Sequence, residues 1–445
     1  MYKPGNQNLL SGIFKTEFVR HSFFLFLGSS IALLLSLALY PVFSRMYSPE
    51  QFGVFGLFTS ITGIVSLLAS GVYEQAILLP KNDTHARSLA LLAMMCTVVI
   101  SLVVFFISLF FRNVIAQKFF NTPEISSFLL WVPVSVILGN IYAIFISYSN
   151  RNKYFSFISQ CSINQGIGVN ISKLLFGLFN YTNYGLILGR LIGQLTSAIQ
   201  LVCQVLRKVR ITAGEIPVAW NNIKEVAVRY KNFPVFSMPL QLINAISTTL
   251  PIFVLSKFFT VHDAGQYSLA AGVLLTPVQL LTGSVSKVLN QSIVERVNQQ
   301  APIKEELFKW LRILMPVTAV LFILFFFVSR PVFVLLFGIE WQEAGSISGI
   351  LLPWVFLVLF TFPISFIPDI FFKQRKALII DIVYLIVRMV SLGIGVYYKD
   401  VILAIILFVI SGCIVLTYNF VWYLSLLKNY GKNIKPVSKS AESFK

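Results

Sequence analysis

Residues 88–111 read SLALLAMMCTVVISLVVFFISLFF, an apolar run without a charged side chain. About 20 apolar residues in a helix are enough to cross the ~30 Å hydrocarbon core of a bilayer. The run therefore predicts a transmembrane helix, and the whole chain has a similar character. Of its 445 residues 57% are hydrophobic and 12% charged, with a mean hydropathy of +0.80, whereas about 25% of the residues in soluble domains are charged. This composition excludes an ordinary cytosolic enzyme or nucleic-acid-binding protein, despite the net charge of +18.

Eleven further apolar runs are long enough to span a membrane, so we expect an all-α polytopic membrane protein with twelve transmembrane helices. The expected spans are 21–44, 52–79, 88–111, 125–149, 154–178, 182–206, 234–259, 264–294, 308–337, 346–372, 377–397 and 401–427.

The connections between the spans predict the orientation and the domains. With a cytoplasmic N-terminus, most of the 35 Lys and Arg residues lie in inner connections, as the positive-inside rule requires. The C-terminus is then also cytoplasmic. The longest connection carries apolar residues at helical spacing and predicts an amphipathic helix on the inner interface. The expected parts are an N-terminal six-helix lobe (1–206), a cytoplasmic amphipathic linker (207–233), a C-terminal six-helix lobe (234–427) and a basic cytoplasmic tail (428–445).

A short motif recurs at an offset of 212 residues. Arg45 is followed eight residues later by Gly53 and then by Phe55, and Lys257 is followed in the same way by Gly265 and Tyr267. An even number of spans separates the copies, so both have the same orientation. The sequence predicts two parallel repeats around a central cavity.

Polar side chains form stripes on three of the expected spans, at intervals that place each stripe on one helical face. Such stripes are typical of helix–helix packing or of a water-filled cavity between the halves. The stripes are Thr59, Thr62, Ser66, Ser70 and Glu74; Ser237, Gln241, Asn244 and Thr248; and Gln279, Thr282, Ser286 and Asn290.

Four cations, Lys173, Arg190, Lys287 and Arg388, lie inside expected spans. A cation near the centre of a bilayer is costly unless it is paired or faces water, although Lys173 and Lys287 are near enough to span ends to snorkel. Arg190 and Arg388 are farther from the ends. Because arginine binds phosphate through two donors at once, we expect these cations to bind an anionic substrate.

The acidic residues Glu74, Asp369 and Asp381 lie toward the inner side, out of easy reach of the two arginines. They are candidates for a gate or for ion coupling. The cysteines have no metal-ligand spacing and the histidines form no cluster, so we expect neither a cofactor nor a bound metal.

Two stretches resemble Wzx-type polysaccharide flippases. The first is Ser44–Phe55 (SRMYSPEQFGVF) with Tyr73–Lys81 (YEQAILLPK), and the second is Tyr230–Pro239 (YKNFPVFSMP) with Asn244, Leu250-Pro251 and Ala264–Tyr267 (AGQY). The resemblance implies the multidrug/oligosaccharidyl-lipid/polysaccharide exporter fold, with two six-helix lobes around a cavity that opens alternately to each side. It also implies an undecaprenyl-diphosphate-linked oligosaccharide, such as an O-antigen repeat unit, as the substrate, turned from the inner to the outer leaflet of a bacterial cytoplasmic membrane.

The hypothesis is that the diphosphate pairs with the four cations while the lipid tail stays in the bilayer. Polar residues of the stripes line the cavity (Ser66, Ser70, Gln241, Asn244, Thr282 and Ser286). Glu74 pairs with Lys287 across an inner gate or carries a coupling proton. Replacing both Arg190 and Arg388 with Ala is expected to abolish function while the protein stays in the membrane. A polysaccharide polymerase and a chain-length regulator are candidate partners.

Four alternatives remain open. A drug or cation exporter of the same fold would need carboxylates in mid-membrane, and a peptidoglycan-precursor flippase would share both fold and cavity charge. A membrane polymerase or glycosyltransferase would need a catalytic constellation, for which the short outer connections offer little. A non-transporting scaffold would not need buried arginines.

Overall fold

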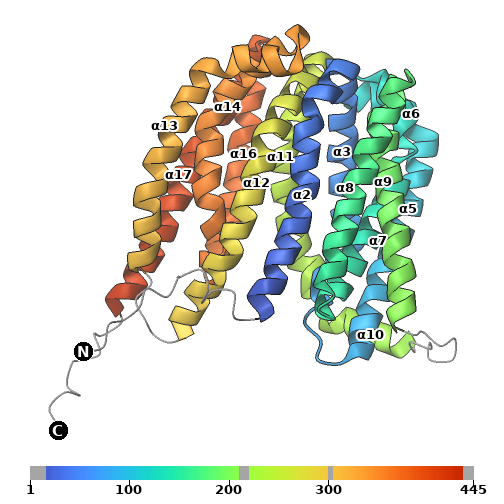
Figure 1. The fold of residues 1–445 in the computed structure, drawn as a ribbon, viewed down its shortest axis with the longest axis vertical. Helices are drawn as coiled ribbons and strands as arrows, with labels where there is room; N and C mark the ends of the chain where they lie inside the picture. The colour runs from blue at the N-terminus through green and yellow to red at the C-terminus, as the bar shows by residue number, and fades with distance from the viewer. Residues whose placement is uncertain (1–16, 210–219, 299–303, 434–445) are drawn as a thin grey trace, which may run out of the picture. The chain divides into compact units, whose positions relative to one another are not determined.

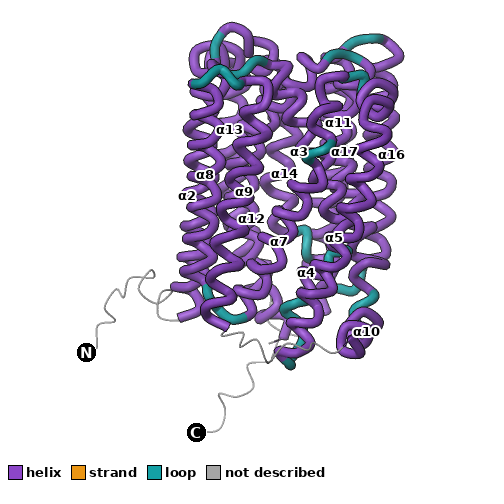
Figure 2. Tube along the Cα trace, turned by 90° about the vertical axis from the view of Figure 1, so that its right-hand side faces the viewer, coloured by secondary structure: helices purple, strands orange, loops and turns teal. Residues whose placement is uncertain are grey.

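The computed structural model describes residues 17–209, 220–298 and 304–433, and every regular element within these ranges is helical (Figure 2). Helices are expected because a chain within a bilayer must satisfy its backbone polar groups internally. The predicted all-α class is confirmed.

Twelve of the described helices contain 20 or more residues, and each overlaps one of the twelve expected spans. They are α2 (Glu17–Met46), α3 (Pro49–Ser70), α5 (Asp83–Val114), α7 (Val132–Arg151), α8 (Phe155–Leu178), α9 (Thr182–Val209), α11 (Met238–Phe258), α12 (Val261–Asn298), α13 (Lys304–Phe337), α14 (Gln342–Thr361), α16 (Gln374–Tyr398) and α17 (Val401–Asn433).

Short helical elements join or extend them. These are α4 (Tyr73–Ala76), α6 (Ser126–Leu129), α10 (Trp220–Arg229) and α15 (Ile367–Ile370), the π-helical turns Ile115–Phe119 and Phe233–Ser237, and the 3₁₀ turns Pro123–Ile125, Ile339–Trp341 and Phe362–Ile364.

Ten of the long helices are also apolar enough to cross a membrane within the described ranges. On α5 only 17% of the most apolar window is buried within the protein, as expected of a helix that faces lipid. Helix α8 is outside this group because polar residues interrupt it, and the apolar part of α2 that is described covers only Ser30–Met46. Ten spans are therefore supported, and the other two remain predictions.

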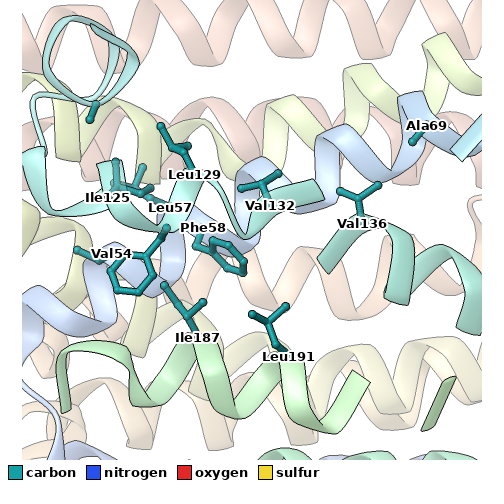
Figure 3. Packing of buried hydrophobic residues seen from close by; sticks show 12 residues of the cluster. Val54, Leu57, Phe58, Ala69, Ile125, Leu129, Val132, Val136, Ile187 and Leu191 are labelled. Carbon is teal, nitrogen blue, oxygen red and sulfur yellow. The ribbon is translucent and has the colours of Figure 1, made fainter. Parts of the chain in front are cut away.

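The chain forms two compact units. Unit 1 comprises residues 1–269 and 336–341, and unit 2 comprises residues 270–335 and 342–445. In unit 1, α8 packs against both α2 and α9 (Figure 1). Its apolar core includes Leu57, Phe58, Val132, Val136 and Ile187, which come from α3, α7 and α9 (Figure 3). In unit 2, α17 packs against α14 and α16. The boundary between the two compact units lies inside α12. The two six-helix lobes expected on either side of residues 207–233 are a different division, based on the sequence repeat, and they remain a prediction.

A close crossing of α3 and α12 explains why the start of α12 belongs to unit 1. A Cβ atom on Gly53 would collide with the Val261 carbonyl oxygen, and one on Gly265 would collide with the Pro49 carbonyl oxygen. Only glycine allows the two backbones to approach so closely. The two glycines of the recurring motif are thus in contact.

Polar groups reinforce this crossing. His262 Nδ1 lies 2.7 Å from Glu50 Oε1, and Gln266 donates a hydrogen bond to the Glu340 carbonyl. The Trp341 indole donates to the Ser44 carbonyl at 2.9 Å. The last two bonds connect residues 336–341 to the rest of unit 1.

The structure corrects the second expected span, which is not one continuous helix. Helix α3 ends at Ser70, and Gly71 and Val72 both adopt left-handed backbone angles (φ 57° and 61°). Glycine tolerates this conformation and valine does not favour it. Glu74 therefore lies on the separate helix α4, and the stripe from Thr59 to Glu74 is not a single helical face. The tenth expected span is also interrupted, by the 3₁₀ turn that follows Thr361, and Asp369 lies on α15.

Part of the connection expected at 207–233 forms α10. Its apolar residues Ile223 and Val226 are buried, and Val226 packs in a cluster with Tyr73, Ala76 and Leu89 of unit 1. His85 and Glu225 approach to 3.7 Å at its edge. Residues 210–219 of the connection and the tail from 434 onward are outside the described residues.

Candidate functional site

The α8–α9 pair brings two of the four predicted cations together. Gly189 on α9 packs against the backbone of Lys173, and Gly193 packs against the backbone of Val169. Small residues let transmembrane helices approach closely. The contact places Lys173 beside the turn of α9 that carries Arg190.

Both side chains line a cavity of about 360 Å³ within unit 1. Helices α2, α3, α7, α8 and α9 contribute to its wall. The lining residues are Ala32, Leu33, Ser36, Phe55, Tyr142, Ser162, Gln165, Gly166, Val169, Lys173, Arg190 and Gln194. The volume is at the small end of the ~300–1,000 Å³ range of ligand pockets, so it is suited to a headgroup rather than to a whole oligosaccharide.

The Lys173 backbone is fixed and its charge rests on aromatic faces. The Tyr47 hydroxyl donates to the Lys173 carbonyl at 2.6 Å. Burial raises the pKa of Tyr47 to about 12, so this hydroxyl keeps its proton. Lys173 Nζ lies 4.5 Å from the ring centroid of Phe55 and 5.7 Å from that of Phe43. Cation–π attraction of this kind compensates only part of the lost hydration.

Arg190 has unused hydrogen-bonding capacity. Its Nε atom is buried and has no hydrogen-bond partner, although a buried polar group is normally paired. Among the residues that the structure describes, no carboxylate forms an ion pair with Arg190 or Lys173. Two neighbouring cations without a described counter-charge make this cavity suited to an anion with several oxygens.

Arg388 has a different environment, inside unit 2. Its side chain is 1% exposed, and the guanidinium carbon lies 4.0 Å from the ring centroid of Tyr384, 4.3 Å from that of Phe408 and 5.2 Å from that of Trp354. We call these three rings the aromatic cage. In this conformation Arg388 lines neither of the two described cavities, so the expectation that it faces an open cavity like Arg190 is not met here.

The other predicted charges are dispersed. Lys287 and Asp369 are exposed, and Asp381 is half-buried on α16. Glu74 is half-buried, and its Oε2 atom has no hydrogen-bond partner in the structure. Their roles at a gate or in coupling remain predictions.

The polar residues of the predicted stripes differ in their hydrogen-bond partners and in their exposure. The Ser66 carbonyl accepts from Asn140, Ser70 Oγ accepts from the Val72 amide at the helix break, and Gln241 bonds Gln75. Asn244 is exposed and Ser286 is half-buried.

Thr282 lies in surroundings unlike those expected of a polar cavity. It is 2% exposed and bonds the Gln279 carbonyl of its own helix. It lines a second cavity, of about 540 Å³, whose wall in unit 2 is mainly leucine, valine, phenylalanine and isoleucine.

Sequence reasoning missed Tyr142, Ser162, Gln165 and Gln194 as lining residues. A signal for two groups was present, because Ser162, Gln165, Val169 and Lys173 follow a helical spacing on α8 and Gln194 is four residues after Arg190. Tyr142 had no such signal, since only the packing of α7 on its neighbours brings it to the cavity.

Comparison with known proteins decides the family. The family model described as "Polysaccharide biosynthesis protein" matches residues 42–346, more than half of the chain. The chain belongs to this family. The family-level resemblance stated from the sequence is thereby confirmed, and the chain is a multi-pass membrane protein.

A curated relative and several solved structures are also similar. The succinoglycan biosynthesis transport protein ExoT of Rhizobium meliloti (strain 1021) is 21% identical over 321 residues, which cover 70% of this chain and 60% of ExoT. The lipid II flippase MurJ, in an inward closed conformation, has a TM-score of 0.71 at 16% identity, over 93% of this chain and 90% of MurJ. An inward-facing multidrug resistance MATE family transporter of the MOP superfamily has a TM-score of 0.65 at 12% identity, over 91% and 96%. At such identities the structures show a shared fold.

Proposed function

We propose that this protein is a flippase that moves an undecaprenyl-diphosphate-linked oligosaccharide, an O-antigen or capsule repeat unit, from the inner to the outer leaflet of the bacterial cytoplasmic membrane. The observation that carries the proposal is the cavity with Lys173 and Arg190 and without a described carboxylate, in a chain of the polysaccharide biosynthesis family. ExoT is named as a transport protein and MurJ as a lipid flippase, and both names support a transport function for this chain.

The cavity chemistry accounts for recognition of the lipid headgroup. The diphosphate supplies several oxygens to Arg190 and Lys173, and its charge offsets the cost of holding two cations away from bulk water. The lipid tail stays in the bilayer. Alternating access then exposes the headgroup and the glycan on the outer side. In this proposal both termini of the protein are cytoplasmic.

The remaining charges are assigned to later steps of the cycle. Lys287 and Arg388 are second candidates for contact with the headgroup, in conformations other than this one. Glu74, Asp369 and Asp381 are candidates for gating or ion coupling, with Glu74 either pairing with Lys287 or carrying a proton. A polysaccharide polymerase and a chain-length regulator would receive the product at the outer leaflet.

The test is leaflet-resolved lipid analysis in the native host. Depletion of the protein should trap the diphosphate-linked oligosaccharide in the inner leaflet, where a membrane-impermeant glycan-modifying probe cannot reach it. Wild-type protein and Arg112→Met, changed outside the cavity, should restore labelling, whereas Arg190→Met should not. Normal outer-leaflet labelling in depleted cells would exclude the flippase function.

A further inference from the structure

The cavity has two chemically different ends. Along α8 its lining runs from Ser162 to Lys173, a distance of about 16 Å at the ~1.5 Å rise per residue of a helix. Lys173 and Arg190 provide the cationic end. Tyr142 and Ser162 provide the opposite end, which is uncharged.

Gln194 adds a fixed hydrogen-bond donor to the cavity. It is 6% exposed, and its Oε1 atom accepts a 2.9 Å hydrogen bond from Ser135, which is fully buried on α7. With the carbonyl side of the amide occupied in this way, Nε2 is the group left to donate to a ligand. Gln194 is one helical turn from Arg190, so both can donate to one set of oxygens.

The hydroxyl end presents acceptors instead. Ser162 Oγ donates its single proton to the Ile158 carbonyl at 3.0 Å, and the Tyr142 and Ser162 oxygens are 3.0 Å apart. Tyr142 is therefore the donor of that bond. Its oxygen keeps a lone pair for a partner such as a sugar hydroxyl.

We propose, on the basis of the proposed function, that the cavity binds a glycosyl diphosphate in one orientation. The phosphate oxygens lie at Lys173, Arg190 and Gln194, and the sugar bonded to the diphosphate lies at Tyr142 and Ser162. The rest of the glycan is outside, because 360 Å³ encloses only a headgroup. Selectivity is thus for the first sugar, with Gln194 as a binding residue and Ser135 as the residue that positions it.

The proposal is tested by binding of soluble probes to the purified full chain in detergent. Inorganic pyrophosphate reports the cationic end alone. A panel of hexose 1-phosphates reports both ends, and inorganic phosphate is its sugar-free reference. Affinities are measured by calorimetry or by thermal shift.

Three variants separate the two ends. Gln194→Glu keeps the acceptor for Ser135 but replaces the donor with a charged acceptor. It should lower the affinity for every probe at least tenfold. Ser135→Ala releases the amide and should weaken all probes a few-fold. Tyr142→Phe should weaken the preferred hexose 1-phosphate about fivefold, as expected for one neutral hydrogen bond, while pyrophosphate binding stays unchanged.

The matched control is Gln200→Glu, on the same helix, where the amide oxygen accepts from Asn164 outside the cavity lining. It should bind all probes like wild type. Unchanged probe binding in Gln194→Glu would overturn the proposed orientation. An equal loss of affinity for pyrophosphate and for hexose phosphates in Tyr142→Phe would overturn it too. In either case, binding that still depends on Arg190 would continue to support the flippase proposal. Failure of wild-type protein to bind any probe would remove the headgroup site itself.

Discussion

Two arginines that look alike in the sequence have opposite surroundings in the folded chain. Arg190 lines a cavity in unit 1 together with Lys173, whereas Arg388 is enclosed in unit 2 by the aromatic cage. A cation in an apolar span is costly unless it faces a polar cavity or has a favourable partner. Arg190 faces a cavity, and the rings around Arg388 attract its charge through their quadrupoles. A buried cation in a span therefore does not by itself mark a substrate site.

The same substitution at Arg190 and at Arg388 should have different effects on transport. Arg190→Met should lower flipping at least tenfold, because it removes charge-assisted hydrogen bonds worth about 1.5–3 kcal/mol. Arg388→Met should lower flipping less than Arg190→Met does, because Arg388 is only a second candidate for substrate contact and an apolar side chain of similar length can replace a well-packed buried cation at little cost. Glycan labelling in complemented cells measures both. Equal losses would mean that Arg388 also contacts substrate at some stage of the cycle.

Truncation of Arg388 should lower the stability of the protein more than it lowers the rate of flipping. Arg388→Ala leaves an empty space between three rings and should lower the free energy of unfolding by about 3 kcal/mol, as for other large-to-small core changes. Denaturation of the purified protein in detergent tests this, with Arg190→Ala as the comparison. A larger loss of stability in Arg190→Ala would reverse the two assignments.

Lys173 is intermediate between the two cases, since it lines the cavity and also lies over Phe55. Lysine offers a point charge without the planar fork of arginine. Lys173→Met should therefore weaken pyrophosphate binding about threefold to tenfold, less than Arg190→Met does. Calorimetry on both variants ranks them, and the opposite order would make Lys173 the main phosphate ligand.

The smallest expected effect is inside the cage. The Trp354 indole donates to the Tyr384 hydroxyl at 3.2 Å, so Tyr384→Phe leaves a buried N–H without its acceptor. This should cost about 1 kcal/mol of stability and leave flipping unchanged. The double variant with Trp354→Phe is the control: the added cost of Tyr384→Phe should shrink there, and full additivity would show that this hydrogen bond contributes nothing.

Much of the fold was predictable because it follows from composition. The apolar runs predicted the helical class, and every expected span overlaps a long helix of the structure. The ends of the spans were less predictable. Val72 is not a residue that signals a left-handed backbone, so the break between α3 and α4 had no clear mark beyond Gly71.

Two of the four predicted cations, Lys173 and Arg190, share one cavity, and both were found by the cost of charge in an apolar span. Gln194 and Tyr142 were missed because amides and hydroxyls are common in helix–helix contacts and carry no comparable cost. Only the direction of their hydrogen bonds in the folded chain separates a ligand donor from an internal contact.

The sequence by itself determined that this chain is an all-helical membrane protein whose spans carry unusual cations, because hydrophobicity and charge are properties of residues. Only the tertiary structure decided which cation is open and which is enclosed, and that Gly53 meets Gly265 across 212 residues. Those outcomes depend on which helices pack together. Packing depends on the shapes of surfaces from distant parts of the chain, which no local pattern contains.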